Sequence, residues 1–145
     1  MVLIDTNILV YAHRADAIYH RAYCEWLDGQ VNLDEPFGIS EMVLSSFVRI
    51  VTHPKIFRFP TSLETALRVA SELRARANCV LMGPGPRHWE IFRRLCQQSG
   101  AKGNLITDAY LAALAIETGC EWITADRDFG RFPSLRWRHP LQRGG

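Results

Sequence analysis

At 145 residues the chain has the size of one domain and is long enough to close a single apolar core. Hydrophobic residues make up 48% and charged residues 22%, which is ordinary for a globular protein, and no apolar run approaches the length of a membrane span. The formal net charge of +2 is too small to indicate a nucleic-acid or membrane partner by itself.

The four cysteines do not indicate a disulfide framework or a metal motif. Cys24, Cys79, Cys96 and Cys120 are widely separated and form no C-x-x-C pair. No basic segment precedes the apolar residues 2–4, so we expect no signal peptide. These features predict reduced core cysteines in a cytoplasmic protein.

Short apolar runs alternate with helical patterns along the chain. The first run, residues 2–4, is β-rich and ends at polar residues, which is typical of a buried strand. Thr6 or Asn7 is a suitable cap for the helix that follows, and Gly29 and Pro54 are expected to end the second and third helices. We expect further strands at 36–39, 79–82 and 121–124 and near 135–137. Helices are expected from residue 8 and at 16–28, 42–51, 63–73, 89–96 and 104–117, and Asn104 is expected to cap the last of them. The tail at 143–145 is expected to fray.

Strands that alternate with helices of this length predict a parallel sheet covered on both faces. The fold class is therefore α/β, a three-layer α/β/α sandwich. No linker, internal repeat or low-complexity segment divides the chain, so we expect one domain.

Four acidic residues are placed where such a sheet binds ligands. Asp5 directly follows the first strand, Glu41 begins the helix after the second, and Asp126 follows the fourth by two residues. Ligands bind outside the carboxyl ends of parallel strands. Asp108 lies one turn inside the helix that Asn104 starts, where the amino end of a helix favours a negative charge. Singly, each acid also suits an ordinary cap, turn or first-turn role.

As a set, the four acids predict a site for a hard divalent metal. Clustered carboxylates repel one another, and some would protonate unless a cation joins them. Mg²⁺ or Mn²⁺ takes oxygen ligands and keeps several waters, which suits a few carboxylates in an open cleft. Such a site favours hydrolysis of phosphate esters. Asn7, Thr6 and Thr124 are candidates to orient the attacking water or the phosphate.

Four segments, in their order along the chain, carry a resemblance to a known family. They are VLIDTNILV at residues 2–10, Glu41 before an apolar helix, DAYLAALA at 108–115 and ITADRDF at 123–129. Together they resemble the PIN-domain ribonucleases, and most closely the VapC toxins of prokaryotic toxin–antitoxin modules. The resemblance covers nearly the whole chain and implies a single PIN domain over residues 1–145 with a five-stranded parallel sheet.

The resemblance also implies an activity, a cofactor and partners. The activity is Mg²⁺- or Mn²⁺-dependent endonucleolytic cleavage of RNA, which inhibits translation. The partners are the RNA substrate, a small VapB-type antitoxin bound near the active site, and a second copy in a homodimer. The residues that match the family's catalytic and metal-binding acids are Asp5, Glu41, Asp108 and Asp126, with Asn7, Thr6 and Thr124 in support.

Several further residues have two alternative roles. Asp128 either assists the metal site or caps the turn before Phe129. The antitoxin groove is expected along the helix at 42–52 and the aromatic loop at 53–60, where Phe57 and Phe59 either bind the partner or are buried in the core. Four arginines are candidates for contacts with the RNA backbone, the alternative being a solvated C-terminal face: Arg127, Arg131, Arg136 and Arg138.

Three other classes of protein are weighed against this prediction. Phosphatases of the haloacid-dehalogenase type also place an Asp after the first strand, but they require a second Asp two residues later, where this chain has Asn7. A receiver-type signalling module needs a lysine at a late strand end, and Thr124-Ala125 provide none. A non-catalytic RNA-binding PIN-like module is disfavoured because all four acids are present.

Overall fold

The computed structural model describes residues 1–142 and contains a sheet of five strands, each parallel to its neighbours. The expectation for 143–145 lies outside the described residues. The order across the sheet is β3-β2-β1-β4-β5. The strands are β1 (Val2–Ile4), β2 (Phe37–Ser40), β3 (Cys79–Met82), β4 (Glu121–Ile123) and β5 (Trp137–Arg138).

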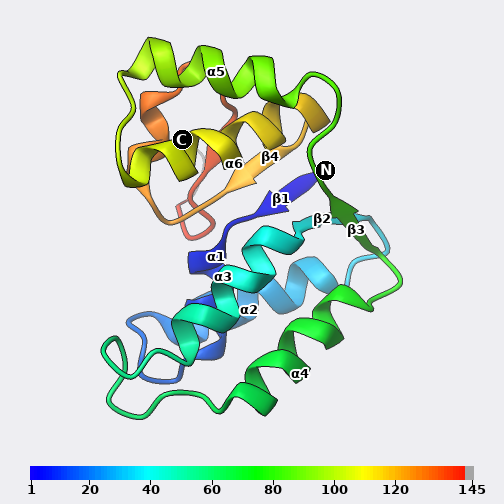
Figure 1. Cartoon of the computed structure of the whole chain (residues 1–145). Coiled ribbons are helices and arrows are strands. Elements are labelled where there is room, and N and C mark those ends of the chain that lie inside the picture. The colour runs from blue at the N-terminus through cyan, green and yellow to red at the C-terminus, as the bar shows by residue number, and fades with distance from the viewer. Residues whose placement is uncertain (143–145) are drawn as a thin grey trace.

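Helices cover both faces of this sheet (Figure 1). On one side α5 packs against α6, and on the other α1 contacts both α2 and α3, which in turn contacts α4. The α/β/α sandwich is therefore confirmed. The helices are α1 (Thr6–His13), α2 (His20–Val31), α3 (Glu41–Val51), α4 (Leu63–Arg74), α5 (His88–Ser99), α6 (Asn104–Thr118) and the short 3₁₀ helix η1 (Arg127–Arg131).

The strand order places a switch point at the centre of the sheet. The chain adds β2 and β3 on one side of β1 and then β4 and β5 on the other. Connections therefore leave β1 and β4 in opposite directions, which opens a crevice outside their carboxyl ends. Asp5 follows β1 and Thr124 follows β4, so the chain places polar residues at this crevice.

The core fixes these two strands in place. Leu3, Ile4, Trp122 and Ile123 are wholly buried, and burial of such side chains stabilises the fold by about 1.5–3 kcal/mol each. The α6 segment Ala109–Ala115 packs over them with mostly small side chains, which lets the helix lie close to the sheet. Asp108, immediately before that segment, is thereby held near the crevice.

Three local expectations are wrong. Asp5, not Thr6 or Asn7, caps α1. The second helix begins at His20 and runs through Gly29 to Val31; burial of Val31 offsets the roughly 1 kcal/mol that a helical glycine costs. Asn104 is the first helical residue of α6, and Gly103 at φ 59° is its cap.

The cysteines are free, as expected, but only Cys120 is buried, and the other three are half-buried. Strands 2–4 and 79–82 are confirmed at their predicted bounds. Among residues 1–142 no helix is both long enough and apolar enough to cross a membrane.

Candidate active site

Asp5 is held at the switch point by contacts to β4 and α1. Its backbone N–H donates to the Ile123 carbonyl on β4 at 2.9 Å. One carboxylate oxygen accepts from the backbone N–H of Thr6 at 2.6 Å, and the other accepts from the Thr124 hydroxyl at 2.7 Å. With 6% of its surface exposed, Asp5 is a buried carboxyl whose orientation the surrounding polar groups determine.

Thr124 and Asn7 join Asp5 to the turn after β4. The wholly buried Thr124 hydroxyl also accepts from the backbone N–H of Asp126 at 3.0 Å. The Asn7 amide nitrogen donates to Asp5 at 3.3 Å and to Thr124 at 3.2 Å, and its oxygen accepts from the Ala125 N–H at 3.1 Å. These contacts use both ends of the Asn7 amide, so this side chain positions its neighbours and does not supply the second carboxylate of a phosphatase.

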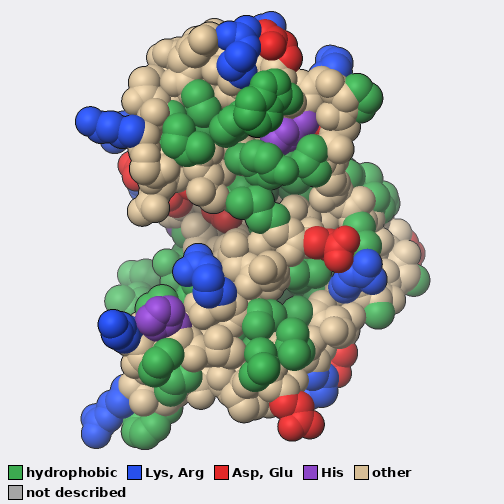
Figure 2. All heavy atoms as spheres, in the orientation of Figure 1, with side chains coloured by type: hydrophobic (Ala, Val, Ile, Leu, Met, Phe, Trp, Pro, Cys, Tyr) green, Lys and Arg blue, Asp and Glu red, His purple; other side chains and the backbone are tan. Residues whose placement is uncertain are grey.

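Asp126 and Asp108 face the same crevice from different elements. Asp126 caps η1, where its carboxylate accepts from the backbone N–H of Asp128 at 2.9 Å. The turn-capping role considered for Asp128 thus belongs to Asp126. Asp5, Asp108 and Asp126 all line one cleft of about 730 Å³, a size usual for a ligand site. Figure 2 shows acidic side chains in the hollow between the surfaces over α6 and α1.

The carboxyls affect each other's charge. Burial raises the pKa of Asp5 from 3.8 to about 6, and the nearby charges of Asp108 and Asp126 contribute to a lesser degree. The hydrogen bonds from Thr124 and Thr6 lower this pKa and so oppose part of the rise. Burial followed by the charges of Asp126 and Asp128 raises the pKa of Asp108 to about 6 as well. The cleft therefore concentrates negative charge at neutral pH, which favours a cation there.

Glu41 lies apart from the other three acids. Its side chain is 67% exposed and pairs with Arg74 across 3.4 Å, and it does not line the cleft. The reason is positional: Glu41 begins α3 after β2, on the far side of β1 from β4. An exposed ion pair of this kind contributes less than about 1 kcal/mol, so it opposes a turn of Glu41 toward the cleft only weakly. Its assignment as a metal ligand stays a prediction.

The donor set fits a hydrated divalent cation. Among residues 1–142 no three acidic, histidine or cysteine side chains lie close enough together to ligate one ion directly. Asp5, Asp108 and Asp126 nevertheless present hard oxygen donors to one cleft, whose lining within the described chain contains no lysine or arginine. Mg²⁺ usually keeps several waters and takes one or two protein carboxylates, so ligation partly through water suits this arrangement.

The four candidate arginines divide into two groups. Arg127 and Arg131 are exposed on η1. Arg127 lies near His139, which lines the cleft. The pKa of His139 is lowered mainly by burial and then by the positive charge of Arg127. The Arg136 guanidinium donates to the Gly119 carbonyl at 2.8 Å, ahead of β4 and away from the carboxyl ends of the strands.

Arg138 is likewise held away from the acids, because it pairs with Glu121 at the start of β4 across 3.2 Å. Of the four arginines, Arg127 is the one whose charge acts on a residue of the cleft lining, His139.

Phe57 and Phe59 also differ. Phe57 is half-buried, lines the cleft and lies beneath the Arg14 guanidinium, whose carbon is 4.1 Å from the ring centroid. Phe59 is 73% exposed and lies outside the cleft lining. The two aromatic residues of this loop thus face different surroundings.

Several cleft residues have no sequence motif. Tyr11, Tyr19, Tyr23 and His139 line the same cleft as the acids. Tyr11 could have been predicted as a cleft residue because it lies close to Asp5 along the chain. Tyr19, Tyr23 and His139 reach the cleft only through tertiary packing.

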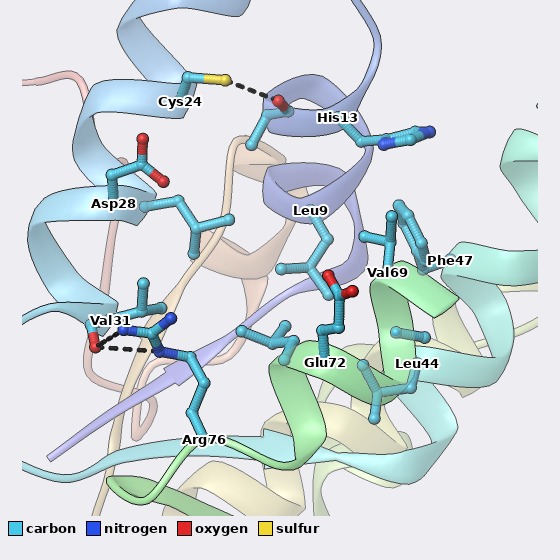
Figure 3. A pocket seen from close by; sticks show the side chains of 14 residues that line it. Leu9, His13, Cys24, Asp28, Val31, Leu44, Phe47, Val69, Glu72 and Arg76 are labelled. Carbon is cyan, nitrogen blue, oxygen red and sulfur yellow. Dashed lines mark hydrogen bonds between the residues drawn. The ribbon is translucent and has the colours of Figure 1, made fainter. Parts of the chain in front are cut away.

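A second, smaller cavity of about 270 Å³ lies between helices on one side of the sheet (Figure 3). Its walls come from α1, α2, α3 and α4, with apolar residues such as Leu9, Leu44 and Val69. The candidate catalytic acids are outside this cavity, so it is separate from the acidic cleft.

Fold and site together define an α/β/α domain with an acidic cleft at the switch point of its sheet. The PIN domain family model matches residues 2–135. Ribonuclease VapC43 of Mycobacterium tuberculosis is 46% identical over 141 residues, which span 97% of this chain and 96% of that one. Ribonuclease VapC25 of the same organism is 39% identical over 97% of this chain and 99% of its own length. The chain therefore belongs to the PIN domain family, and its relatives place it among the VapC proteins.

Solved structures with low sequence identity share the fold. VapBC2 from Rickettsia felis, bound to a promoter DNA fragment, aligns with a TM-score of 0.69 at 22% identity over 95% of this chain and 98% of that one. Mycobacterium tuberculosis VapC20, described as a sarcin–ricin loop cleaving toxin, aligns with a TM-score of 0.67 at 15% identity over 94% and 99%. The resemblance inferred from the four sequence segments is thus confirmed.

Proposed function

We propose that this protein is an endoribonuclease that hydrolyses RNA phosphodiester bonds with Mg²⁺ or Mn²⁺ and acts as the toxin of a VapBC-type module by inhibiting translation. The observation that carries the proposal is the convergence of Asp5, Asp108 and Asp126 on one cleft at the β1–β4 switch point. The names of its relatives, which are ribonucleases, support the choice of RNA as substrate.

The roles of the residues follow from their contacts. Asp5, Asp108 and Asp126 would hold the cation, with Glu41 as a further ligand once it leaves Arg74. A bound divalent cation supplies a water of lowered pKa and neutralises charge on the leaving oxygen. Thr124 and Asn7 hold Asp5 and the turn bearing Asp126 in fixed relation.

Two apolar surfaces support partner binding as part of the proposal. The cavity between α1, α2, α3 and α4 has room for one or a few apolar side chains of a partner, which supports docking of a VapB-type antitoxin on this face in the cytoplasm. Trp89 on α5 is 68% exposed and Ile106 on α6 is 36% exposed. Figure 2 shows hydrophobic side chains gathered on the surface over these two helices, which supports a homodimer. Light scattering of Trp89→Glu tests the dimer, which should become a monomer.

The activity is tested with purified protein and RNA. We expect cleavage with added Mg²⁺ or Mn²⁺, none with excess EDTA, and none from Asp108→Asn. The matched control is Glu64→Gln, which removes an exposed carboxylate of α4 outside the cleft and should cleave normally. Binding of RNA without cleavage by the wild type would favour a non-catalytic module, and full activity of Asp108→Asn would refute the metal site.

Inhibition of translation is tested in a cell-free extract with the same variants. Protein synthesis should fall with the wild type and with Glu64→Gln and should continue with Asp108→Asn. Equal inhibition by Asp108→Asn would separate the toxic effect from cleavage and contradict the proposal.

A further inference from the structure

Beyond the carboxylates, the cleft has a wall of aromatic and apolar side chains. Tyr11 comes from α1, Ile18 and Tyr19 from the loop before α2, and Ile56 and Phe57 from the loop after α3. This wall and the acids line one continuous cleft, so the wall is accessible to a molecule that is bound at the acids.

Tyr19 stands out on this wall by its exposure and its backbone. Its side chain is 72% exposed although it lines the cleft. It is also the one non-glycine residue with positive φ, at 59°, within residues 1–142. A side chain other than glycine is strained in this region, and such strain is concentrated at functional sites. The fold thus holds an exposed aromatic ring at the cleft in a backbone conformation that glycine would adopt more easily.

The residues that neighbour Tyr19 in the cleft pack against one another. The Tyr11 and Tyr23 rings lie 5.0 Å apart between centroids, and the Tyr23 ring is 6.3 Å from that of His139. His20, which follows Tyr19, is tied by a ring nitrogen to the Tyr11 carbonyl at 2.8 Å. These contacts hold the loop that carries Tyr19 against α1.

We propose that Tyr19 is a substrate-specificity residue that stacks on an unpaired nucleobase of the RNA, so that the enzyme selects single-stranded segments over duplexes. This inference rests on the proposed ribonuclease function. Aromatic side chains stack on the faces of bases, and those faces are accessible only when the base is unpaired.

Distance and charge agree with this assignment. Tyr11, at the near end of the wall, is six residues from Asp5, which is about 9 Å along a helix and within about three stacked nucleotide steps. Because the described lining lacks lysine and arginine, the wall suits a neutral base better than a phosphate. The wall that carries Tyr19 therefore begins within a few nucleotides of the acids.

The experiment measures binding separately from cleavage. In an Asp108→Asn background, fluorescence anisotropy with Mg²⁺ present gives the Kd for a short single-stranded oligoribonucleotide and for a duplex of the same sequence. We expect preference for the single strand, a loss of about 5- to 150-fold in Tyr19→Ala, and affinity kept within about twofold in Tyr19→Phe, which retains the ring. Leu63→Ala, which removes a 60% exposed apolar side chain outside the cleft, is the control and should bind normally.

Two further measurements separate stacking from damage to the fold. Tyr19→Gly relieves the backbone strain, so its melting temperature should be no lower than that of the parent while its RNA affinity falls as in Tyr19→Ala. An oligonucleotide with one abasic position, scanned along the strand, should weaken binding to the parent at one position and leave Tyr19→Ala unaffected there.

Several results would overturn the inference. The first is that the parent and Tyr19→Ala bind single strands with equal affinity. The second is that Tyr19→Ala loses as much affinity for the duplex as for the single strand. The third is that no abasic position weakens binding to the parent while leaving binding to Tyr19→Ala unchanged. A loss of antitoxin binding in Tyr19→Ala with unchanged RNA binding would assign the wall to a protein partner instead. Metal-dependent cleavage by the wild-type protein alongside any of these results would leave the proposed function intact.

Discussion

Replacing Asp5 with asparagine should stabilise the metal-free protein at neutral pH, although the residue is central to the candidate site. Burial raises the pKa of Asp5 above its ordinary value, so the folded protein holds this proton more tightly than the unfolded chain does. Stability contributed by this group is therefore complete below about pH 4, falls as the pH rises to about 6, and stays low above that. Asparagine carries no charge and removes this pH-dependent loss.

The size of this gain in stability follows from the burial and the hydrogen bonds of Asp5. The rise from 3.8 to about 6 is about two pKa units, or about 3 kcal/mol at neutral pH for a carboxyl that is 6% exposed. Asparagine accepts from the Thr6 N–H but loses the charge-assisted bond from Thr124, which costs about 2 kcal/mol. The net gain is then about 1 kcal/mol, or about 0.5 M in the urea midpoint.

Urea unfolding of wild type and Asp5→Asn in EDTA, at pH 4 and pH 7.5, measures this difference. The variant should be more stable at pH 7.5 and equal or slightly less stable at pH 4. Added Mg²⁺ should then stabilise the wild type more than the variant, because the cation binds the folded carboxylates. A variant less stable than wild type at pH 7.5 in EDTA, or a difference that does not change with pH, would refute this account of the Asp5 environment.

Three other expectations follow from the same contacts. Thr124→Val should lower the free energy of unfolding by about 1–3 kcal/mol, because it leaves the buried Asp5 carboxylate and the Asp126 N–H without the hydroxyl, and Thr124→Ser should restore most of the loss; urea unfolding checks both. Glu41→Gln should change stability by less than about 1 kcal/mol, since its ion pair is exposed, yet reduce RNA cleavage at least about tenfold if it joins the metal; unchanged cleavage would remove it from the site. Glu117→Ala should destabilise the fold by about 1–3 kcal/mol by thermal unfolding, because its carboxylate accepts from the N–H groups of Gly85 and Arg87 at 2.7 and 2.8 Å, and a wild-type melting temperature would contradict this.

Local patterns in the sequence were sufficient to predict the layers of the fold and the positions of the three acids that line the cleft. Alternating apolar runs and helical spacings predicted the α/β/α sandwich because strands buried on both faces are nearly uninterrupted apolar runs. Asp5, Asp108 and Asp126 were predicted at the carboxyl edge because their position relative to an element's end is a property of the chain alone.

Other features depend on packing between distant segments. The strand order, the pairing of Glu41 with Arg74 and the turning of Arg136 toward Gly119 involve residues far apart in the chain or on different elements. Helix ends moved for the same reason: burial of Val31 carries α2 past Gly29, and the Thr124 hydroxyl helps to fix Asp5 as the cap of α1. Which side chains meet is settled by the sum of many small burial and hydrogen-bond terms across the whole chain. The sequence therefore defined the chemistry of Asp5 and its neighbouring acids, whereas tertiary packing determined the aromatic wall around Tyr19 and the exposed position of Glu41.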